Sequence, residues 1–190
     1  MSATTATSTE LLNALFDPEA GAWGAFVGRY RPLIESFAER CGLSSEEARD
    51  VAQSVLLEFY RSYSEGKYQR DRGRLRDWLF GIARHRVGRL RRDPERRLLS
   101  LTEDAESGPS DVGSLWEAAW QRELLLAALA RVKADVDPAT FEAFELFALA
   151  GVPSKAVAES LGITENAVYG AKRRIMTRLR EVRSELENLY

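Results

Sequence analysis

The most informative segment is residues 151–180, GVPSKAVAESLGITENAVYGAKRRIMTRLR. Ser154 is suited to cap a short helix, and Gly162 is suited to the positive backbone angle of a tight turn. We expect Ile163 to insert from this turn into the core, and Thr164 to cap a second helix. The inward positions of both helices are small or apolar: Val157, Ala158, Leu161, Ala167, Val168 and Ala171. The pattern predicts a helix-turn-helix.

The outward positions of the second helix carry side chains that suit nucleic acid. Polar groups near its start match base edges, and the cations that follow match phosphates. These residues are Glu165, Asn166, Tyr169, Lys172, Arg173 and Arg174. The alternative is an ordinary helical hairpin with a polar face. The short helix, the glycine turn, the threonine cap and the basic second helix together favour DNA binding.

A second basic segment, RLRDWLFGIARHRVGRLRR, covers residues 74–92. Its spacing predicts a helix with one apolar stripe, including Trp78, and arginines elsewhere. Arginine suits phosphate contacts and stacking on bases better than lysine does. The preceding segment, residues 66–73, begins and ends with glycine and predicts a loop. Its Tyr68 is either a base-stacking residue or a packing aromatic, and His85, among arginines, favours a nucleic-acid contact over catalysis.

Charge and composition limit the class of protein. The net charge is −2, yet residues 61–97 hold 13 Lys or Arg against 5 Asp or Glu. Hydrophobic residues make up 45% of the 190 residues, which argues against a disordered chain. Cys41 is the only cysteine and His85 the only histidine in the sequence. An intramolecular disulfide is therefore excluded, and a zinc cluster would lack ligands. We expect a cytoplasmic protein with no membrane insertion, catalytic centre, metal or cofactor.

The predicted architecture is all-α, with two small helical domains joined by a flexible acidic linker. No segment alternates as a strand would. The linker is rich in Gly, Pro, Ser and acidic residues, which cannot bury a core. The expected divisions are a disordered tail over residues 1–9, an N-terminal domain over 10–96, the linker over 97–115, and a C-terminal domain with the helix-turn-helix over 116–190.

Capping signals predict where helices begin. Asp17 is suited to cap a helix that Pro32 then kinks or divides. Ser44 and Glu47 match a capping box at the start of the next helix. Asp137, followed by proline, is suited to cap a helix in the C-terminal domain.

Three segments in this order resemble the extracytoplasmic-function group of the sigma-70 family of bacterial RNA polymerase. DVAQSVLLEFY, residues 50–60, is similar to the family's polymerase-binding helix. Residues 74–92 resemble the helix that engages the −10 element, and residues 151–180 resemble the helix-turn-helix that recognises the −35 element. The resemblance covers nearly the whole chain after the tail. It implies an alternative sigma factor that directs promoter-specific transcription initiation.

The resemblance also implies partners and site residues. The partners are promoter DNA and core RNA polymerase, through the clamp helices of the largest subunit and the flap of the second-largest subunit. The implied polymerase-binding residues are Asp50, Gln53, Ser54, Leu56 and Leu57. The implied −10 residues are Lys67, Tyr68, Gln69, Arg70, Arg74, Arg76, Arg84, His85, Arg86, Arg89 and Arg92. The implied −35 residues are Thr164, Glu165, Asn166, Tyr169, Lys172, Arg173, Arg174 and Arg178.

Some positions depart from the family pattern. Arg49 and Ser54 stand where acidic residues are common, so the docking helix carries less negative charge. Phosphorylation of Ser54 would restore charge, and a merely tolerated substitution is the alternative. His85 replaces a common Asn. Gly170-Ala171 replaces a frequent Ser-Arg, so the −35 sequence preference does not carry over.

Two alternatives to a sigma factor remain open. One is a helix-turn-helix regulator that does not associate with polymerase, which leaves the arginine-rich helix without a role. The other is an adaptor or inhibitor that binds polymerase without promoter specificity. Family members are commonly held inactive by an anti-sigma protein or controlled by a kinase, and the resemblance extends that expectation to this chain.

Overall fold

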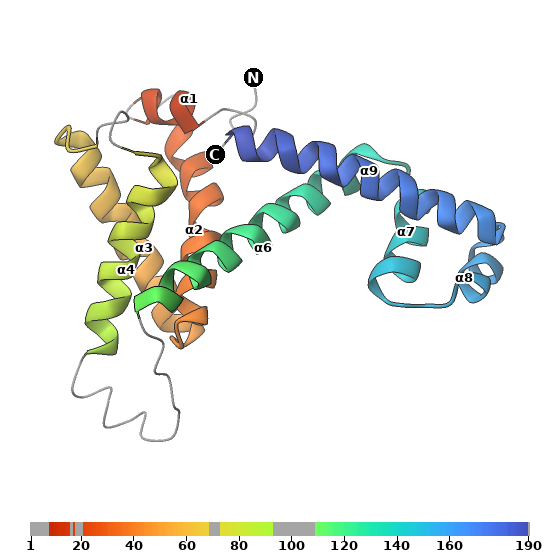
Figure 1. The fold of residues 1–190 in the computed structure, drawn as a ribbon. Coiled ribbons are helices and arrows are strands. Elements are labelled where there is room, and N and C mark those ends of the chain that lie inside the picture. The colour runs from red at the N-terminus through yellow and green to blue at the C-terminus, as the bar shows by residue number, and fades with distance from the viewer. Residues whose placement is uncertain (1–7, 16, 18–20, 69–72, 93–108, 190) are drawn as a thin grey trace. The chain divides into compact units, whose positions relative to one another are not determined.

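The computed structural model describes residues 8–15, 17, 21–68, 73–92 and 109–189. The described residues form helices and no strand, which confirms the all-α prediction for that part of the chain. The elements in chain order are α1 (Ser8–Asn13), α2 (Ala22–Arg40), α3 (Ser45–Ser64), α4 (Leu75–Arg91), α6 (Pro109–Asp135), α7 (Pro138–Phe144), a π-helical segment η4 (Glu145–Leu149), α8 (Ser154–Leu161) and α9 (Glu165–Leu189) (Figure 1).

Packing groups the chain into two compact units, one formed by residues up to Glu123 and the other by Leu124–Asn188. None of the helices in the described residues is long and apolar enough to cross a membrane. Residues 1–7 of the tail predicted over 1–9, and residues 97–108 of the predicted linker, lie outside the described residues. The prediction is wrong for residues 8 and 9, because they begin helix α1.

The predicted capping signals have different outcomes. The capping box at α3 is confirmed, since Ser44 accepts from the Glu47 N–H and the Glu47 carboxylate accepts from the Ser44 N–H at 2.8 Å. Asp137 caps α7 by accepting from the Thr140 N–H at 2.9 Å. The prediction for Asp17 is wrong for α2, because that helix begins at Ala22 with Gly21 in the capping position.

Pro32 lies inside α2 and does not divide it. Proline removes one backbone hydrogen bond from a helix. The neighbouring side chains Leu33 and Ile34 are fully buried in the core of the first unit. Their burial stabilises the helical path on both sides of the proline, so tertiary packing outweighs the local preference.

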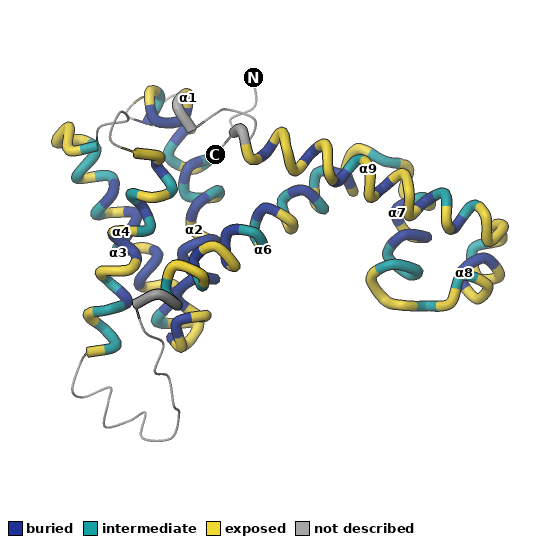
Figure 2. Tube along the Cα trace, in the orientation of Figure 1, coloured by how far each residue is buried: buried dark blue, intermediate teal, exposed yellow. Residues whose placement is uncertain are grey.

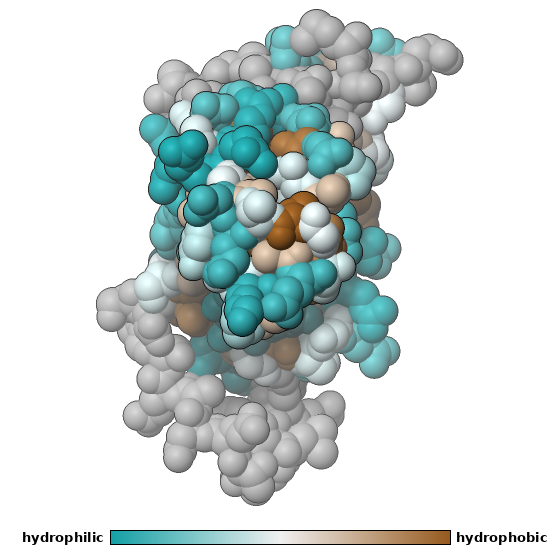
Figure 3. Space-filling model, turned by 90° about the vertical axis from the view of Figure 1, so that its right-hand side faces the viewer, coloured by the Kyte–Doolittle hydropathy of each residue, from teal (hydrophilic) through white to brown (hydrophobic). Residues whose placement is uncertain are grey.

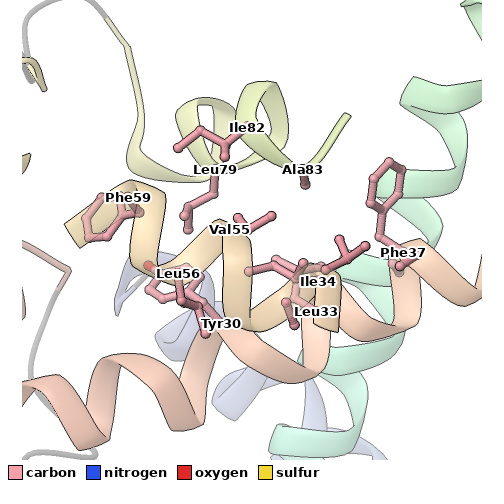
Figure 4. Close-up of a cluster of buried hydrophobic side chains, with 14 of the residues drawn as sticks. Tyr30, Leu33, Ile34, Phe37, Val55, Leu56, Phe59, Leu79, Ile82 and Ala83 are labelled. Carbon is pink, nitrogen blue, oxygen red and sulfur yellow. The ribbon is translucent and has the colours of Figure 1, made fainter. Parts of the chain in front are cut away.

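Aromatic rings join α2, α3 and α4. Phe26 of α2 stacks on Phe59 of α3, with ring centroids 4.6 Å apart and planes 13° apart. Phe59 meets Trp78 of α4 edge-on, with centroids 5.4 Å apart. Helix α3 packs against both of the other helices, and Figure 4 shows Val55 and Leu79 among the apolar side chains that fill the space between them. The three helices therefore share one core.

A second aromatic cluster joins α6 to the same core. Phe37 of α2 meets Trp116 of α6 with centroids 5.2 Å apart, and Phe80 of α4 lies 5.4 Å from Trp116. Trp116, Ala119 and Trp120 are all buried in this cluster. The start of α6 thus packs with the first unit, although composition assigned residues 109–115 to the linker and residues from 116 to the C-terminal domain. Trp116 and Trp120, four residues apart, form an apolar stripe on α6. The polar composition of the residues before them gave no indication of this stripe.

Helix α1 is tied to α3 by one hydrogen bond. The hydroxyl of Tyr63 donates to the carbonyl oxygen of Leu12 at 2.9 Å. Partial burial raises the pKa of Tyr63 above its ordinary value, because burial disfavours the charged phenolate.

The second unit encloses a small core between α7, η4, α8 and α9. Its members are Ala143, Val157, Ala158, Val168 and Ala171. Burial recurs along α9 at helical spacing, visible as dark segments in Figure 2. Gly162 adopts φ 64° between α8 and α9, and Thr164 accepts from the Ala167 N–H at 3.2 Å. The glycine turn and the threonine cap are therefore confirmed.

Two details of the turn differ from the sequence prediction. Pro153, and not Ser154, occupies the capping position of α8, so the Ser154 hydroxyl makes contacts elsewhere. Ile163 is 37% exposed and does not insert into the core. Its N–H donates to the Ala158 carbonyl oxygen at 3.0 Å, which closes the turn through the backbone alone.

Replacing Phe59 with Ala is expected to destabilise the first unit by about 3–5 kcal/mol, because it removes the ring that both α2 and α4 contact and leaves a cavity. The free energy of unfolding in urea measures the loss. Leu57→Ala, on an exposed position of the same helix, is the matched control and is expected to cost less than about 1 kcal/mol. A loss for Phe59→Ala as small as the control would contradict the shared core.

Candidate functional site

One surface of α3 combines polar groups with an exposed leucine. Asp50, Gln53 and Leu57 are exposed and share a face of the helix, since they lie three and four residues apart. Leu57 is 45% exposed. Leu56, predicted beside it as a polymerase-binding residue, is only 4% exposed, so the structure places it in the core.

Leu57 separates two hollows in the surface of the first unit. One hollow of about 320 Å³ lies between α2 and α3, and Trp23, Val27, Arg31, Gln53, Leu56 and Leu57 line it. The other, of about 520 Å³, includes Ser54, Leu57, Arg61 and Arg86 in its lining. A large exposed apolar side chain between hollows is the kind of anchor found in protein interfaces. We define Asp50, Gln53 and Leu57 as the α3 face.

Two arginines of α4 are engaged inside the first unit. Arg86 forms two contacts with the same carboxylate oxygen of Glu58 in α3, at 2.8 and 2.9 Å. Arg76 pairs with Glu117 of α6 at 3.0 Å, and its guanidinium lies 4.8 Å from the ring centre of Trp120. Both were predicted as −10 residues. In this structure their charges are matched by carboxylates of the same unit.

The remaining basic groups of α4 lie at the surface. Arg84, His85, Arg89 and Arg92 are exposed, as is Arg74 at the start of the helix. A hollow of about 680 Å³ is lined by Arg84, His85, Arg91 and Arg92, together with Gly81, Gly88 and the buried Cys41. We define Arg84, His85, Arg89 and Arg92 as the α4 basic face, which can attract a polyanion.

The loop before α4 is only partly described. Gln69 and Arg70, two predicted −10 residues, lie outside the described residues. Lys67 is exposed and pairs with Glu65. The ring of Tyr68 stacks on Trp78, with centroids 4.9 Å and planes 18° apart, and its hydroxyl lies 3.4 Å from the carbonyl oxygen of Gly73. Tyr68 is thus a packing aromatic here, and its proposed contact with a flipped base stays a prediction.

The start of α9 displays the predicted −35 residues. Asn166, Arg173 and Arg174 are exposed. Lys172 is exposed too, and its ammonium lies 5.2 Å from the ring centre of Phe147 in η4. The view in Figure 3 shows mostly hydrophilic side chains around a small apolar area.

A hydrogen-bonded cluster links α8 to α9. The Ser154 hydroxyl donates to Glu165 Oε2 at 2.6 Å, and the oxygens of Ser154 and Tyr169 lie 3.1 Å apart. The Tyr169 ring meets Phe147 edge-on, with centroids 5.3 Å apart. Sequence reasoning missed Ser154 and Phe147 as part of this site. The available signal was Pro153, because a proline at the capping position makes Ser154 the first residue of α8 and leaves its hydroxyl free of a capping role.

Arg178 does not lie among the free cations of α9. It contacts the carboxylates of Glu181 at 3.2 Å, Asp135 at 3.4 Å and Glu185 at 3.6 Å. The hydrogen bond to Glu181, followed by these neighbouring charges, raises the pKa of Arg178 above its ordinary value. A guanidinium so surrounded is matched within its own unit, and its proposed phosphate contact would compete with three carboxylates.

The pair of Arg86 and Glu58 predicts a measurable coupling. In a double-mutant cycle with Arg86→Ala and Glu58→Ala, the coupling free energy of unfolding is expected to be about 0.2–1 kcal/mol, as for other half-exposed ion pairs. Arg89→Ala, on an exposed position of the same helix, is expected to change stability by less than about 0.5 kcal/mol. Additive effects of Arg86→Ala and Glu58→Ala would show that the contact contributes nothing.

The segment that carries the α3 face and the α4 basic face matches a known protein family. Residues 26–97 match the family Sigma-70 region 2, which extends from within α2 through α4. No curated protein matches the chain. Residues 26–97 are thus similar to region 2 of sigma-70 factors, a class that acts with RNA polymerase and promoter DNA in transcription.

Proposed function

We propose that the chain is an alternative sigma factor of the extracytoplasmic-function group. It binds core RNA polymerase through the α3 face, and directs promoter-specific initiation through −10 and −35 contacts. The observation that carries the proposal is that the region 2 match covers one packed three-helix core bearing both the α3 face and the α4 basic face. A factor of this kind acts in the cytoplasm, where its polymerase is.

Polymerase binding rests on the chemistry of the α3 face. Leu57 offers an apolar anchor, and Gln53 and Asp50 offer polar groups about one and two turns away, respectively. The clamp helices of the largest polymerase subunit are the partner that the family resemblance indicates. Leu56 would contribute by supporting Leu57 from the core. Ser54 borders the second hollow, where phosphorylation would add negative charge beside this face.

Contact with the −10 element rests on the α4 basic face. Three exposed basic groups on α4 and Arg92 directly after it suit the phosphate backbone and the edge of a melted strand. Arg76 and Arg86 have a structural role before any role in DNA binding, since each already pairs with a carboxylate of the same unit. Tyr68 would have to leave Trp78 to take up a flipped base.

Contact with the −35 element rests on α8, the Gly162 turn and α9, which we propose to act as a helix-turn-helix. In that motif the second helix enters the major groove with its N-terminal residues at base edges. Glu165, Asn166 and Tyr169 stand at the start of α9, and Arg173 and Arg174 follow within reach of phosphates. A regulator that binds DNA without polymerase would use these residues and would leave the α3 face without a partner.

Leu57→Ser is expected to weaken binding to core RNA polymerase by about 10-fold or more, because it removes the apolar anchor of an interface. Its free energy of unfolding should stay within about 1 kcal/mol of the wild type, since the side chain is 45% exposed. Leu56→Ala is the matched comparison, expected to lose about 2–5 kcal/mol of stability through its buried position. Wild-type affinity for polymerase in Leu57→Ser would contradict docking through the α3 face.

Arg173→Ala and Arg174→Ala are each expected to reduce the slope of log affinity against log salt by about 1, since each removes one phosphate contact. The affinity of the reconstituted holoenzyme for a promoter fragment, measured at several salt concentrations, gives the slope. Arg183→Ala is the control, because Arg183 lies farther along α9 and pairs with Glu187 at 3.0 Å. Slopes that fall equally for all three variants would argue against a phosphate role specific to Arg173 and Arg174.

A further inference from the structure

Ser154 joins two residues that the proposed function places at base edges. Its hydroxyl oxygen lies 2.6 Å from Glu165 Oε2 and 3.1 Å from the hydroxyl oxygen of Tyr169. These contacts connect the first turn of α8 with the first two turns of α9. Among the described residues, they are the side-chain hydrogen bonds that the structure gives to Glu165 and Tyr169.

The protons of this cluster can be assigned from its chemistry. A serine hydroxyl carries one proton, and an ionised carboxylate only accepts. The short contact to Glu165 therefore takes the Ser154 proton in a charge-assisted bond. The Ser154 oxygen then accepts, so the Tyr169 hydroxyl must donate to it. The protons run from Tyr169 to Ser154 and from Ser154 to Glu165.

This assignment decides what the cluster offers to a ligand. The Tyr169 proton is used internally, so the phenol oxygen keeps only acceptor capacity toward solvent. Glu165 keeps its second carboxylate oxygen, Oε1, which is also an acceptor. Tyr169 is 52% exposed, and its ring is fixed by the edge-on contact with Phe147. The two side chains thus present acceptors in a fixed arrangement.

We propose that Ser154 is a positioning residue for base specificity, which makes Glu165 and Tyr169 an acceptor-only surface for an exocyclic amino group. In the major groove that group is N4 of cytosine or N6 of adenine. Guanine and thymine present acceptors at the corresponding edge, and they are disfavoured at this pair because neither Glu165 nor Tyr169 offers them a donor. The inference rests on the proposed binding of DNA by α9 and adds which base chemistry its first turn selects.

Loss of the Ser154 hydroxyl changes this selection in two ways. The Tyr169 proton becomes free to donate to O6 or N7 of guanine, or to O4 of thymine. Glu165 also loses its fixed orientation and regains rotamer freedom, which weakens its contact with an amino group. Ser154→Ala is therefore expected to relax base preference without changing the number of phosphate contacts.

The test uses the full chain with core polymerase and a library of promoter fragments that carries all four bases at each upstream position. Sequencing of bound fragments gives the preference at each position. The wild type is expected to favour cytosine or adenine over guanine and thymine by about 5- to 100-fold at one position. Ser154→Ala is expected to reduce that ratio to about 3-fold or less, and Ser154→Thr, which keeps the hydroxyl, to preserve it.

Two further variants separate positioning from folding. Ser160→Ala removes a hydroxyl of α8 that bonds to the Val157 carbonyl within the same helix, and it should keep the wild-type preference. Tyr169→Phe in the Ser154→Ala background removes the freed donor, and it should abolish the gained tolerance of guanine and thymine. The salt slope and unfolding midpoint of Ser154→Ala should match those of the wild type.

An unchanged base preference in Ser154→Ala, with the wild type selective, would overturn the inference and leave the proposed function standing. A wild type that favours guanine or thymine at every contacted position would also overturn it. A wild-type holoenzyme that binds fragments without any upstream base preference would overturn both this inference and the −35 part of the proposed function.

Discussion

The contact on which the first unit depends is the packing of Phe59 between two other aromatic rings. Phe26 stacks on one side, and Trp78 approaches it edge-on from α4. Burial of such rings contributes both apolar area and a preferred geometry. Because Phe59 lies on α3, the helix that bears Asp50, Gln53 and Leu57 is fixed relative to the basic helix α4.

Charge in this chain is divided between structure and surface. Arg76, Arg86 and Arg178 are matched by carboxylates from other helices or turns. Arg84, Arg89 and Arg173 are exposed. Cations that are paired with carboxylates attract a polyanion less than exposed cations do. Fewer residues of the basic segments are therefore candidates for DNA contact than their composition indicates. The same division explains how a chain of net charge −2 can present local positive faces.

Local signals predicted much of the fold. The capping box at Ser44, the glycine turn at Gly162 and the cap at Thr164 depend on residues close in sequence, and the structure contains all three. Partners distant in sequence were not predictable. Glu58 lies 28 residues from Arg86, and Glu117 lies 41 residues from Arg76, so only the packed helices bring them together. Ser154 was misplaced because Pro153 takes the capping position of α8, and Ile163 was misplaced because the backbone closes the turn without its side chain. The helical start of α6 was obscured by its acidic and glycine-containing composition.

Transcription from defined DNA tests the central claim most directly. Core RNA polymerase is combined with the purified full chain on promoter fragments that the complex selects, and run-off transcripts are measured with and without the chain. We predict transcripts that start at one position and that require both the chain and the selected −10 and −35 sequences. DNA binding by the chain alone, with no stable polymerase complex and no dependent transcript, would contradict a sigma factor and favour a regulator that acts without polymerase.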